Sequence, residues 1–275
     1  MNKVKKYKLD KIESWFRQFK GTITAFSGGV DSALVLYLSR TYLGKEKTIG
    51  VISASESLKD KDYKLAVDFC KTHDIKLLTI KTDEIDDPSY NSNPWNRCYY
   101  CKTHLYIDLN KMAIQYPGFV IINGNNKDDY DDFRPGHKAS DEHGIRSPLA
   151  ELKIGKDEVR RLAKSFNLGN WDKPASPCLS SRIPYGEVVT VSKLKQIEKA
   201  EAILNNYGFY EVRVRHYGQD CKIEVPKKDI NQLNSSFQTI NREIHKLGFK
   251  NCLIDIDGLE SGKLNKSLNL GNGQS

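Results

Sequence analysis

The sequence carries Ala25-Phe26-Ser27-Gly28-Gly29-Val30-Asp31-Ser32 between an apolar run and a helical pattern. The residues before Ser27 are β-prone and predict a strand, and the apolar spacing after Ser32 predicts a helix. Gly28 and Gly29 allow backbone angles and close approaches that a Cβ would forbid. The unpaired first amides and the positive dipole end of the helix favour an anion. This stretch therefore predicts a strand, an anion-binding glycine turn and a helix.

The glycine turn differs from a Walker A loop, because no lysine follows its glycines. Residues 27–32 (Ser27, Gly28, Gly29, Val30, Asp31, Ser32) instead resemble the SGGxDS signature of the PP-loop ATP pyrophosphatases. The resemblance implies that this loop grips the phosphates of ATP and that Asp31 is associated with Mg²⁺. It also implies that ATP adenylates a carboxylate or carbonyl oxygen while pyrophosphate leaves. Ser53, at the end of the next predicted strand, is expected near the adenosine.

The composition is that of a globular chain: 39% of the 275 residues are hydrophobic and 28% are charged. No apolar run approaches the length of a membrane span, and the charged N-terminus is not followed by the apolar region of a signal peptide. A cytoplasmic location is therefore predicted. The net charge of +8 favours an anionic partner such as a nucleotide, a phosphate ester or RNA. A generic basic surface explains the charge equally well.

Strands and helices are predicted to alternate along the first two thirds of the chain. After an amphipathic helix marked by Leu9, Ile12, Trp15, Phe16 and Phe19, the predicted strands cover 22–26, 48–53, 76–82 and 119–123. The predicted helices cover 57–73, 101–116 and 156–166, and the predicted loops cover 83–97, 124–144 and 167–186. This order predicts an α/β fold, a parallel sheet with helices on both faces and ligand-binding loops at one edge.

A second, smaller domain is predicted after the sheet. Helices are predicted over 192–206 and 227–247, and strands over 211–216, 222–225 and 251–256. The resulting αββαβ order predicts an α+β domain. The predicted domains are therefore 1–184 and 185–275, and the tail from Lys263 onward is predicted to be frayed.

Three of the six cysteines have a spacing that suggests chemistry. Cys98 and Cys101 form a CxxC at a predicted loop-to-helix junction, and Cys178 lies in a proline-braced loop. A lone CxxC is typical of a redox pair, half of a zinc site or two ordinary thiols. Three thiolates beside a nucleotide also fit a 4Fe–4S cluster with one open iron, which the spacing alone supports weakly. The other three are most simply packing residues: Cys70, Cys221 and Cys252.

Three further segments resemble one branch of the PP-loop enzymes, the LarE family of ATP-dependent sulfur transferases. They are Trp171 to Gly186, Asn125 to Gly136, and Val212 to Arg215. The resemblance runs from the ATP loop to about Asn265. It implies that ATP adenylates a carboxylate of pyridinium-3,5-biscarboxylic acid mononucleotide and that sulfur replaces oxygen. The product is a thiocarboxylate on the path to the nickel-pincer nucleotide cofactor.

The family has two sulfur sources, and the cysteines indicate which one this chain uses. One subgroup sacrifices a cysteine at the position that aligns with Pro177, and it has a tryptophan at the position of Cys98. The other binds a 4Fe–4S cluster on three cysteines, which here would be Cys98, Cys101 and Cys178. We therefore predict the cluster-bearing type, with sulfide or a cysteine desulfurase as external donor and a homo-oligomeric state. Cys178 as a sacrificial donor remains the alternative.

Several charged residues are candidates for binding substrate or metal. Arg213 and Arg215 point the same way on a predicted strand and suit a phosphate, although a solvated basic face has the same pattern. Arg182 is predicted to be catalytic, together with Asp31 and Cys178, and could clamp a phosphate or carboxylate. Its neighbour Ser181 is predicted to bind substrate. The same clamping role is predicted for Arg134. The resemblance implies a metal-binding role for Glu201, whose alternative is an exposed helical carboxylate.

Three rival functions can be compared with this one. A tRNA thiolase with a 4Fe–4S cluster would suit the basic charge, but such enzymes usually carry zinc-ribbon CxxC pairs or an RNA-binding module. An amide-forming NAD or GMP synthetase needs no cysteine triad. A nucleotide-binding module without activity would leave the triad and the arginines unexplained. Nucleic acid and membrane partners are therefore not expected.

Overall fold

The computed structural model describes residues 3–131, 135–174, 176–260 and 262–265. It contains two compact units. The first is formed by residues 1–84 and 96–176, and the second by residues 85–95 and 177–275. The predicted boundary between residues 184 and 185 stays a prediction. No helix in the described part of the chain is long and apolar enough to span a membrane.

A four-stranded parallel sheet forms the centre of the first unit. Its strands are β1 (Gly21–Ala25), β2 (Thr48–Ser53), β3 (Lys76–Ile80) and β4 (Phe119–Ile122), in the order β3-β2-β1-β4. The central Ile23 of β1 is in register with Ile49 of β2 and Ile121 of β4. The predicted parallel α/β sheet is therefore confirmed.

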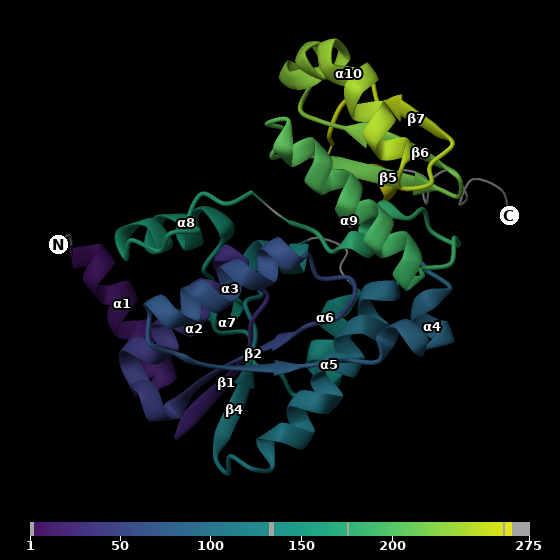
Figure 1. The fold of residues 1–275 in the computed structure, drawn as a ribbon. Coiled ribbons are helices and arrows are strands. Elements are labelled where there is room, and N and C mark those ends of the chain that lie inside the picture. Colours follow the sequence, from purple (N-terminus) through teal and green to yellow (C-terminus); the bar gives the residue numbers. More distant parts are fainter. Residues whose placement is uncertain (1–2, 132–134, 175, 261, 266–275) are drawn as a thin grey trace, which may run out of the picture. The chain divides into compact units, whose positions relative to one another are not determined.

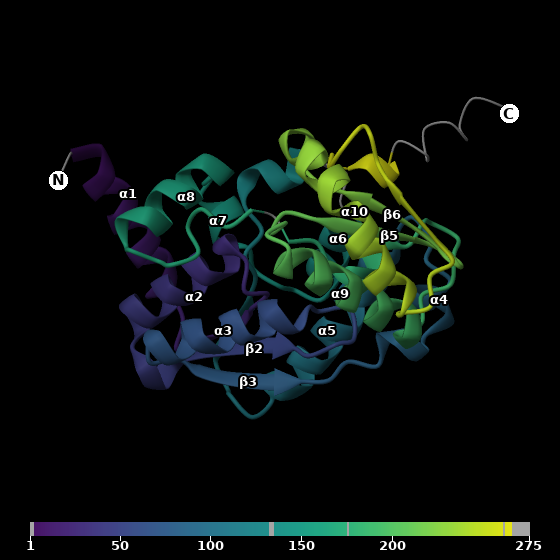
Figure 2. The same cartoon turned by 45° about the horizontal axis from the view of Figure 1, so that its top comes forward.

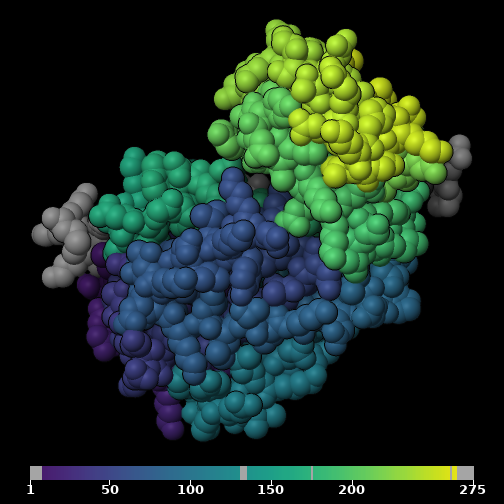
Figure 3. Space-filling view, in the orientation of Figure 1, coloured from purple at the N-terminus to yellow at the C-terminus, as the bar shows by residue number. Residues whose placement is uncertain are grey.

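Helices cover both faces of this sheet (Figure 1, Figure 2). They are α1 (Lys3–Phe16), α2 (Val30–Leu43), α3 (Asp60–Thr72), α5 (Arg97–Ala113), α6 (Gly136–Glu142), α7 (Pro148–Glu151) and α8 (Lys156–Ser165). Ile122 packs with α1, α2 and α8, whereas Ile23 and Ile121 pack with α5 and α6 on the opposite face. Alternation of side chains along each strand separates the two cores. Edge strand β3 is partly exposed, and the blue segment that contains it is visible on the surface (Figure 3).

Two loop predictions were wrong in detail. The predicted loop 124–144 contains a 3₁₀ turn, Lys127–Asp131, and helix α6. The sequence of α6 is polar, but the helix buries Ala139 and Ser140, and it packs against α5. Helix α5 begins at Arg97, so both cysteines of the CxxC lie in its first turns.

The second unit has its own sheet and core. Its elements are α4 (Pro88–Asn91), α9 (Val191–Asn206), β5 (Arg213–Tyr217), β6 (Asp220–Glu224), α10 (Ile230–His245) and β7 (Asn251–Ile254). Strands β5 and β6 are antiparallel, whereas β6 and β7 are parallel. Leu204 and Ile240 of the helices pack with Val214 and Ile223 of the strands. The predicted αββαβ order is confirmed.

One close backbone contact fixes where the sheet meets the glycine turn. A Cβ added to Gly124, just after β4, would lie 2.5 Å from the backbone nitrogen of Ser32 and 2.7 Å from its Cα. These are backbone atoms at the start of α2, so they cannot move aside as a flexible side chain would. Only glycine therefore lets the end of β4 lie against the first turn of α2.

We expect Gly124→Ala to lower the free energy of unfolding by about 1–3 kcal/mol, as overpacking does elsewhere. Gly169→Ala is the matched control, because its added Cβ would meet no atom within 4 Å. Urea unfolding of the two variants makes the comparison. Equal midpoints would show that the turn and β4 can separate without cost.

Candidate active site

The glycine turn has the geometry of an anion-binding loop. Gly28 adopts φ 72°, in the left-handed region that favours glycine, and α2 begins at Val30. The Ser32 hydroxyl accepts a hydrogen bond from the Ser27 amide at 3.2 Å and donates to the Gly29 carbonyl at 3.1 Å. In the described part of the chain, the N-cap position of α2, Gly29, has no side-chain cap hydrogen bond, so the first amides of the helix can meet a ligand. The turn is thus held by its own serines and open at the helix end.

The carboxylate of Asp31 is held by residues from two other segments of the first unit. The Asn126 side-chain amide donates to Asp31 Oδ1 at 3.1 Å, and Lys156 Nζ lies 2.5 Å from Oδ2. The Lys156 side chain is 37% exposed, so its ammonium can move. Lys156 therefore places a cation beside the glycine turn, whose own sequence contains none. A carboxylate at this position also has the hard oxygen donors that Mg²⁺ prefers.

Asp128 fixes the segment that carries Lys156. Its carboxylate accepts a hydrogen bond from the Lys156 backbone amide at 2.7 Å, at the start of α8. A Cβ on Gly155 would lie 2.8 Å from this carboxylate, so only glycine permits the approach. The Lys127 amide also donates to the Ile154 carbonyl at 2.9 Å. The loop after β4 and the start of α8 thus form one support beside Asp31.

Ser53 lies at the end of β2, as expected. Its hydroxyl is 2.7 Å from the hydroxyl of Thr82, just after β3. The carboxyl ends of β2 and β3 therefore carry neighbouring hydroxyl groups at the edge where ligands bind in such sheets. Its adenosine-binding role stays a prediction.

Cys98 and Cys101 lie three residues apart on α5, so they share one side of its first turns. The Cys98 side chain is exposed and the Cys101 side chain is partly exposed. Tyr106 raises the pKa of the Lys102 ammonium most. Burial lowers this pKa, and the nearby Cys101 and Cys98 raise it. A cation beside two thiols favours thiolates in return. Two accessible cysteine side chains at this spacing fit the donor chemistry of an iron–sulfur cluster.

Arg182 is buried in the second unit, where it organises the turn that carries Cys178. Its Nε and Nη2 donate to the Glu201 carboxylate at 2.7 and 3.3 Å, and only 1% of its side chain is exposed. Its Nη1 donates to the carbonyls of Pro177 and Cys178 at 2.9 and 3.3 Å. Glu201 is therefore a buried partner of Arg182 rather than an exposed helical carboxylate. The predicted clamping role of Arg182 and metal role of Glu201 stay predictions.

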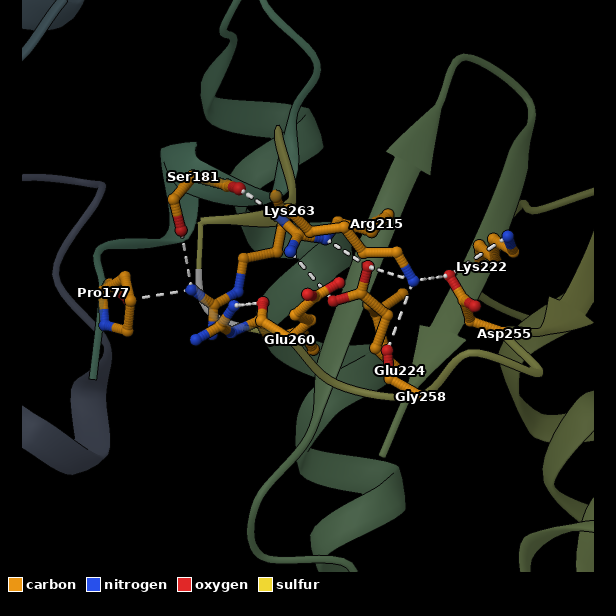
Figure 4. A network of polar contacts seen from close by, with 12 residues as sticks. Pro177, Ser181, Arg215, Lys222, Glu224, Asp255, Gly258, Glu260 and Lys263 are labelled. Carbon is orange, nitrogen blue, oxygen red and sulfur yellow. Dashed lines mark hydrogen bonds and ion pairs between the residues drawn. The ribbon is translucent and has the colours of Figure 1, made fainter. Parts of the chain in front are cut away.

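Arg213 and Arg215 lie on the same side of β5 but have different surroundings. Figure 4 shows Arg215 beside Glu224 and Ser181. Arg215 forms a buried, two-pronged pair with Glu224, with both distances 2.9 Å, and donates to the Ser181 carbonyl at 2.6 Å. Arg213 is partly exposed, and its one described hydrogen bond goes to the Glu260 carbonyl at 3.0 Å. Burial lowers the pKa of the Arg213 guanidinium, and the charges of Arg182 and Arg215 lower it further. An anion beside Arg213 would relieve this repulsion.

The described residues leave the predicted triad in two separate units. Cys98 and Cys101 belong to the first unit and the exposed Cys178 to the second. Within the described ranges, no group of three or more His, Cys, Asp or Glu side chains is arranged to hold a metal ion. The convergence of the three cysteines stays a prediction. Arg134 lies outside the described residues.

The sequence interpretation missed several residues of this site. Asn126 and Lys156 are single polar residues with no diagnostic spacing, although each lies next to a strand end or a helix start. Glu224 was missed because its pairing with Arg215 depends on the β5–β6 register. Alternation along a hairpin could have shown that these two side chains share a face.

Comparison with known proteins supports an ATP-dependent enzyme. A family model described as NAD synthase matches residues 2–96, which include the glycine turn. The NH(3)-dependent NAD(+) synthetase of Thermotoga maritima is 42% identical over 67 residues, which cover 22% of this chain and 21% of that protein. This short match supports the nucleotide-binding part alone.

Two relatives match most of the chain. An uncharacterized protein of Synechocystis sp. is 39% identical over 263 residues, or 95% of this chain and 98% of that protein. The pyridinium-3,5-bisthiocarboxylic acid mononucleotide synthase of Lactiplantibacillus plantarum is 35% identical over 244 residues, or 89% of this chain and 88% of that protein. Since this likeness extends through both units, the chain belongs to the LarE family of ATP-dependent sulfur transferases in the PP-loop superfamily.

Proposed function

We propose that this protein adenylates pyridinium-3,5-biscarboxylic acid mononucleotide and converts its carboxylates to thiocarboxylates in nickel-pincer nucleotide synthesis. The observation that carries the proposal is similarity over 89% of this chain to a synthase of the corresponding bisthiocarboxylic acid mononucleotide. The glycine turn with Asp31 and Lys156 supports the use of ATP. In the second unit, three arginines lie beside two carboxylates, which supports an anionic substrate. They are Arg182, Arg213 and Arg215, with Glu201 and Glu224.

The reaction has two steps. First, a substrate carboxylate oxygen attacks the α-phosphorus of ATP, the bond to the bridging oxygen breaks, and pyrophosphate leaves. The amides at the start of α2 and Lys156 would stabilise the negative charge of the departing phosphates. In the second step sulfide attacks the activated carboxyl carbon, the bond to the AMP oxygen breaks, and the thiocarboxylate and AMP remain.

Two groups outside the protein chain complete this proposal. Asp31 would hold Mg²⁺, which when bound neutralises phosphate charge. Cys98, Cys101 and Cys178 would hold a 4Fe–4S cluster, which when bound supplies the sulfur. The solvent-accessible cysteine side chains at positions 98 and 101, with the ammonium of Lys102 nearby, have the donor chemistry of such ligands. An external sulfide or cysteine desulfurase donor and a homo-oligomeric state are part of the same proposal.

A single experiment tests the reaction and the sulfur source. Anaerobically purified protein should contain iron and acid-labile sulfide, and with ATP and the pyridinium substrate it should release AMP and pyrophosphate. Mass spectrometry should show Cys178 intact after several turnovers. ADP with phosphate as products would reject the adenylation chemistry. Conversion of Cys178 to dehydroalanine after one turnover would instead establish sacrifice of this residue, and ATP-dependent thiolation of tRNA would favour the tRNA-modifying alternative.

We expect Lys156→Met to lower kcat/KM for ATP on the order of 100-fold, because it removes the cation beside the phosphate loop. Lys153→Met is the matched control, since Lys153 is exposed and lies three residues earlier. Pyrophosphate release under steady-state conditions provides the measurement. Similar values for both variants would mean that Lys156 only neutralises Asp31.

We expect Arg213→Ala to raise KM for the pyridinium substrate about 10- to 100-fold with little change in kcat, because a charge-assisted contact to phosphate is lost from ground-state binding. Arg242→Ala, at an exposed position of α10, is the control in the same unit. Substrate titrations at saturating ATP make the comparison. An unchanged KM would remove Arg213 from the substrate site.

A further inference from the structure

Residues 170–174 and 176, which we call the strap, lie beside the glycine turn of the first unit. The Asn170 side-chain amide donates to the Gly28 carbonyl in a long hydrogen bond of 3.4 Å. Arg160 Nη2 donates to the Lys173 carbonyl at 3.2 Å, and the Lys164 ammonium lies 4.4 Å from the centre of the Trp171 ring. The strap thus contacts both the glycine turn and helix α8.

Asp62, in the first turn of α3, holds the far end of this strap. Its carboxylate accepts hydrogen bonds from Lys173 Nζ at 2.9 Å and from the Ser176 hydroxyl at 2.7 Å. Asp62 is only 8% exposed. Burial would raise the pKa of this carboxyl, but the hydrogen bonds from Ser176 and Lys173 outweigh burial and keep the pKa below its usual value. The Asp62 carboxylate is therefore ionised and accepts hydrogen bonds from two donors of the strap, and we call this contact the latch.

The same turn of α3 also supports the phosphate loop. A Cβ on Gly28 would lie 3.3 Å from the Ala66 Cβ and 3.4 Å from the Asp62 carbonyl oxygen, so the loop lies directly against α3 at Asp62. The backbone of Asp62 thus contacts the glycine turn, while the Asp62 side chain binds the strap. Two residues beyond Ser176 the chain reaches Cys178.

We propose that Asp62 is a positioning residue for sulfur transfer, which acts by fixing the strap that leads to Cys178. This inference rests on the proposed function. Adenylation needs the phosphate loop and Asp31, neither of which contacts the Asp62 carboxylate. Sulfur transfer needs the Cys178 segment in addition. Loss of the latch therefore uncouples the two steps: AMP still forms, but less thiocarboxylate is made for each AMP.

The test compares Asp62→Asn with Asp68→Asn, an exposed position on the same helix. Both products are measured with the holoenzyme under anaerobic conditions. For Asp62→Asn we expect AMP release within about twofold of wild type and a fall in thiocarboxylate per AMP on the order of 10- to 100-fold, as expected when a reacting group is displaced by about 1 Å. A proportional loss of both products, or no change, would overturn the inference.

Hydrogen exchange gives a readout that does not depend on activity. In Asp62→Asn the deuterium uptake of residues 168–176 should rise, while that of α2 stays unchanged. Lys173→Met should raise the uptake of the same residues, and the double variant should be no worse than Asp62→Asn, because the ion pair with Lys173 is already lost in Asp62→Asn. Unchanged deuterium uptake of the strap in Asp62→Asn would overturn the role of Asp62. Failure of the wild-type protein to make thiocarboxylate would instead reject the proposed function, and the exchange experiment would still test Asp62.

Discussion

The contact of Asp31 with Asn126 and Lys156 joins three segments that are distant in the sequence. Asp31 follows the glycine turn after β1, Asn126 follows β4, and Lys156 begins α8. The pairing of β1 with β4 in parallel register brings the first two segments to one edge of the sheet. Gly124 then lets them approach to backbone contact. The fold therefore places a cation, Lys156, beside the glycine turn, whose own sequence contains none.

In the second unit, buried charge pairs hold together segments that are separate in the sequence. Removing two ions from water is costly, and a buried pair persists only where further hydrogen bonds satisfy its remaining donors and acceptors. Arg182 and Arg215 meet this condition, since their spare N–H groups bind the carbonyls of Pro177, Cys178 and Ser181. The two pairs thereby define the backbone of the cysteine turn. Arg213, whose side chain is partly exposed, is the member of the group best placed to meet a substrate phosphate.

The sequence was sufficient for the parts of the fold that depend on local pattern. The β1–turn–α2 unit, the alternation of strands and helices, and the αββαβ order of the second unit all follow from periodicity and glycine chemistry. Helix α6 was missed because it is short and polar, and its formation depends on packing against α5. Lys156 and Glu224 were missed for a related reason. Their roles come from partners more than a hundred residues away or from a strand register, which no local pattern contains.

The anchoring of the chain around Cys178 bears on how sulfur can be delivered. Two residues before Cys178, the Ser176 hydroxyl donates to the Asp62 carboxylate in the first unit. In the second unit, the carbonyls of Pro177 and Cys178 accept hydrogen bonds from Arg182. Both anchors are charge-assisted hydrogen bonds, which are shorter and stronger than neutral ones. The Cys178 side chain itself is exposed. A fixed backbone with an accessible thiol suits a ligand or donor that must be presented in one orientation. It does not suit a cysteine carried on a freely moving loop, because reactive groups gain most when their geometry is set before the reaction.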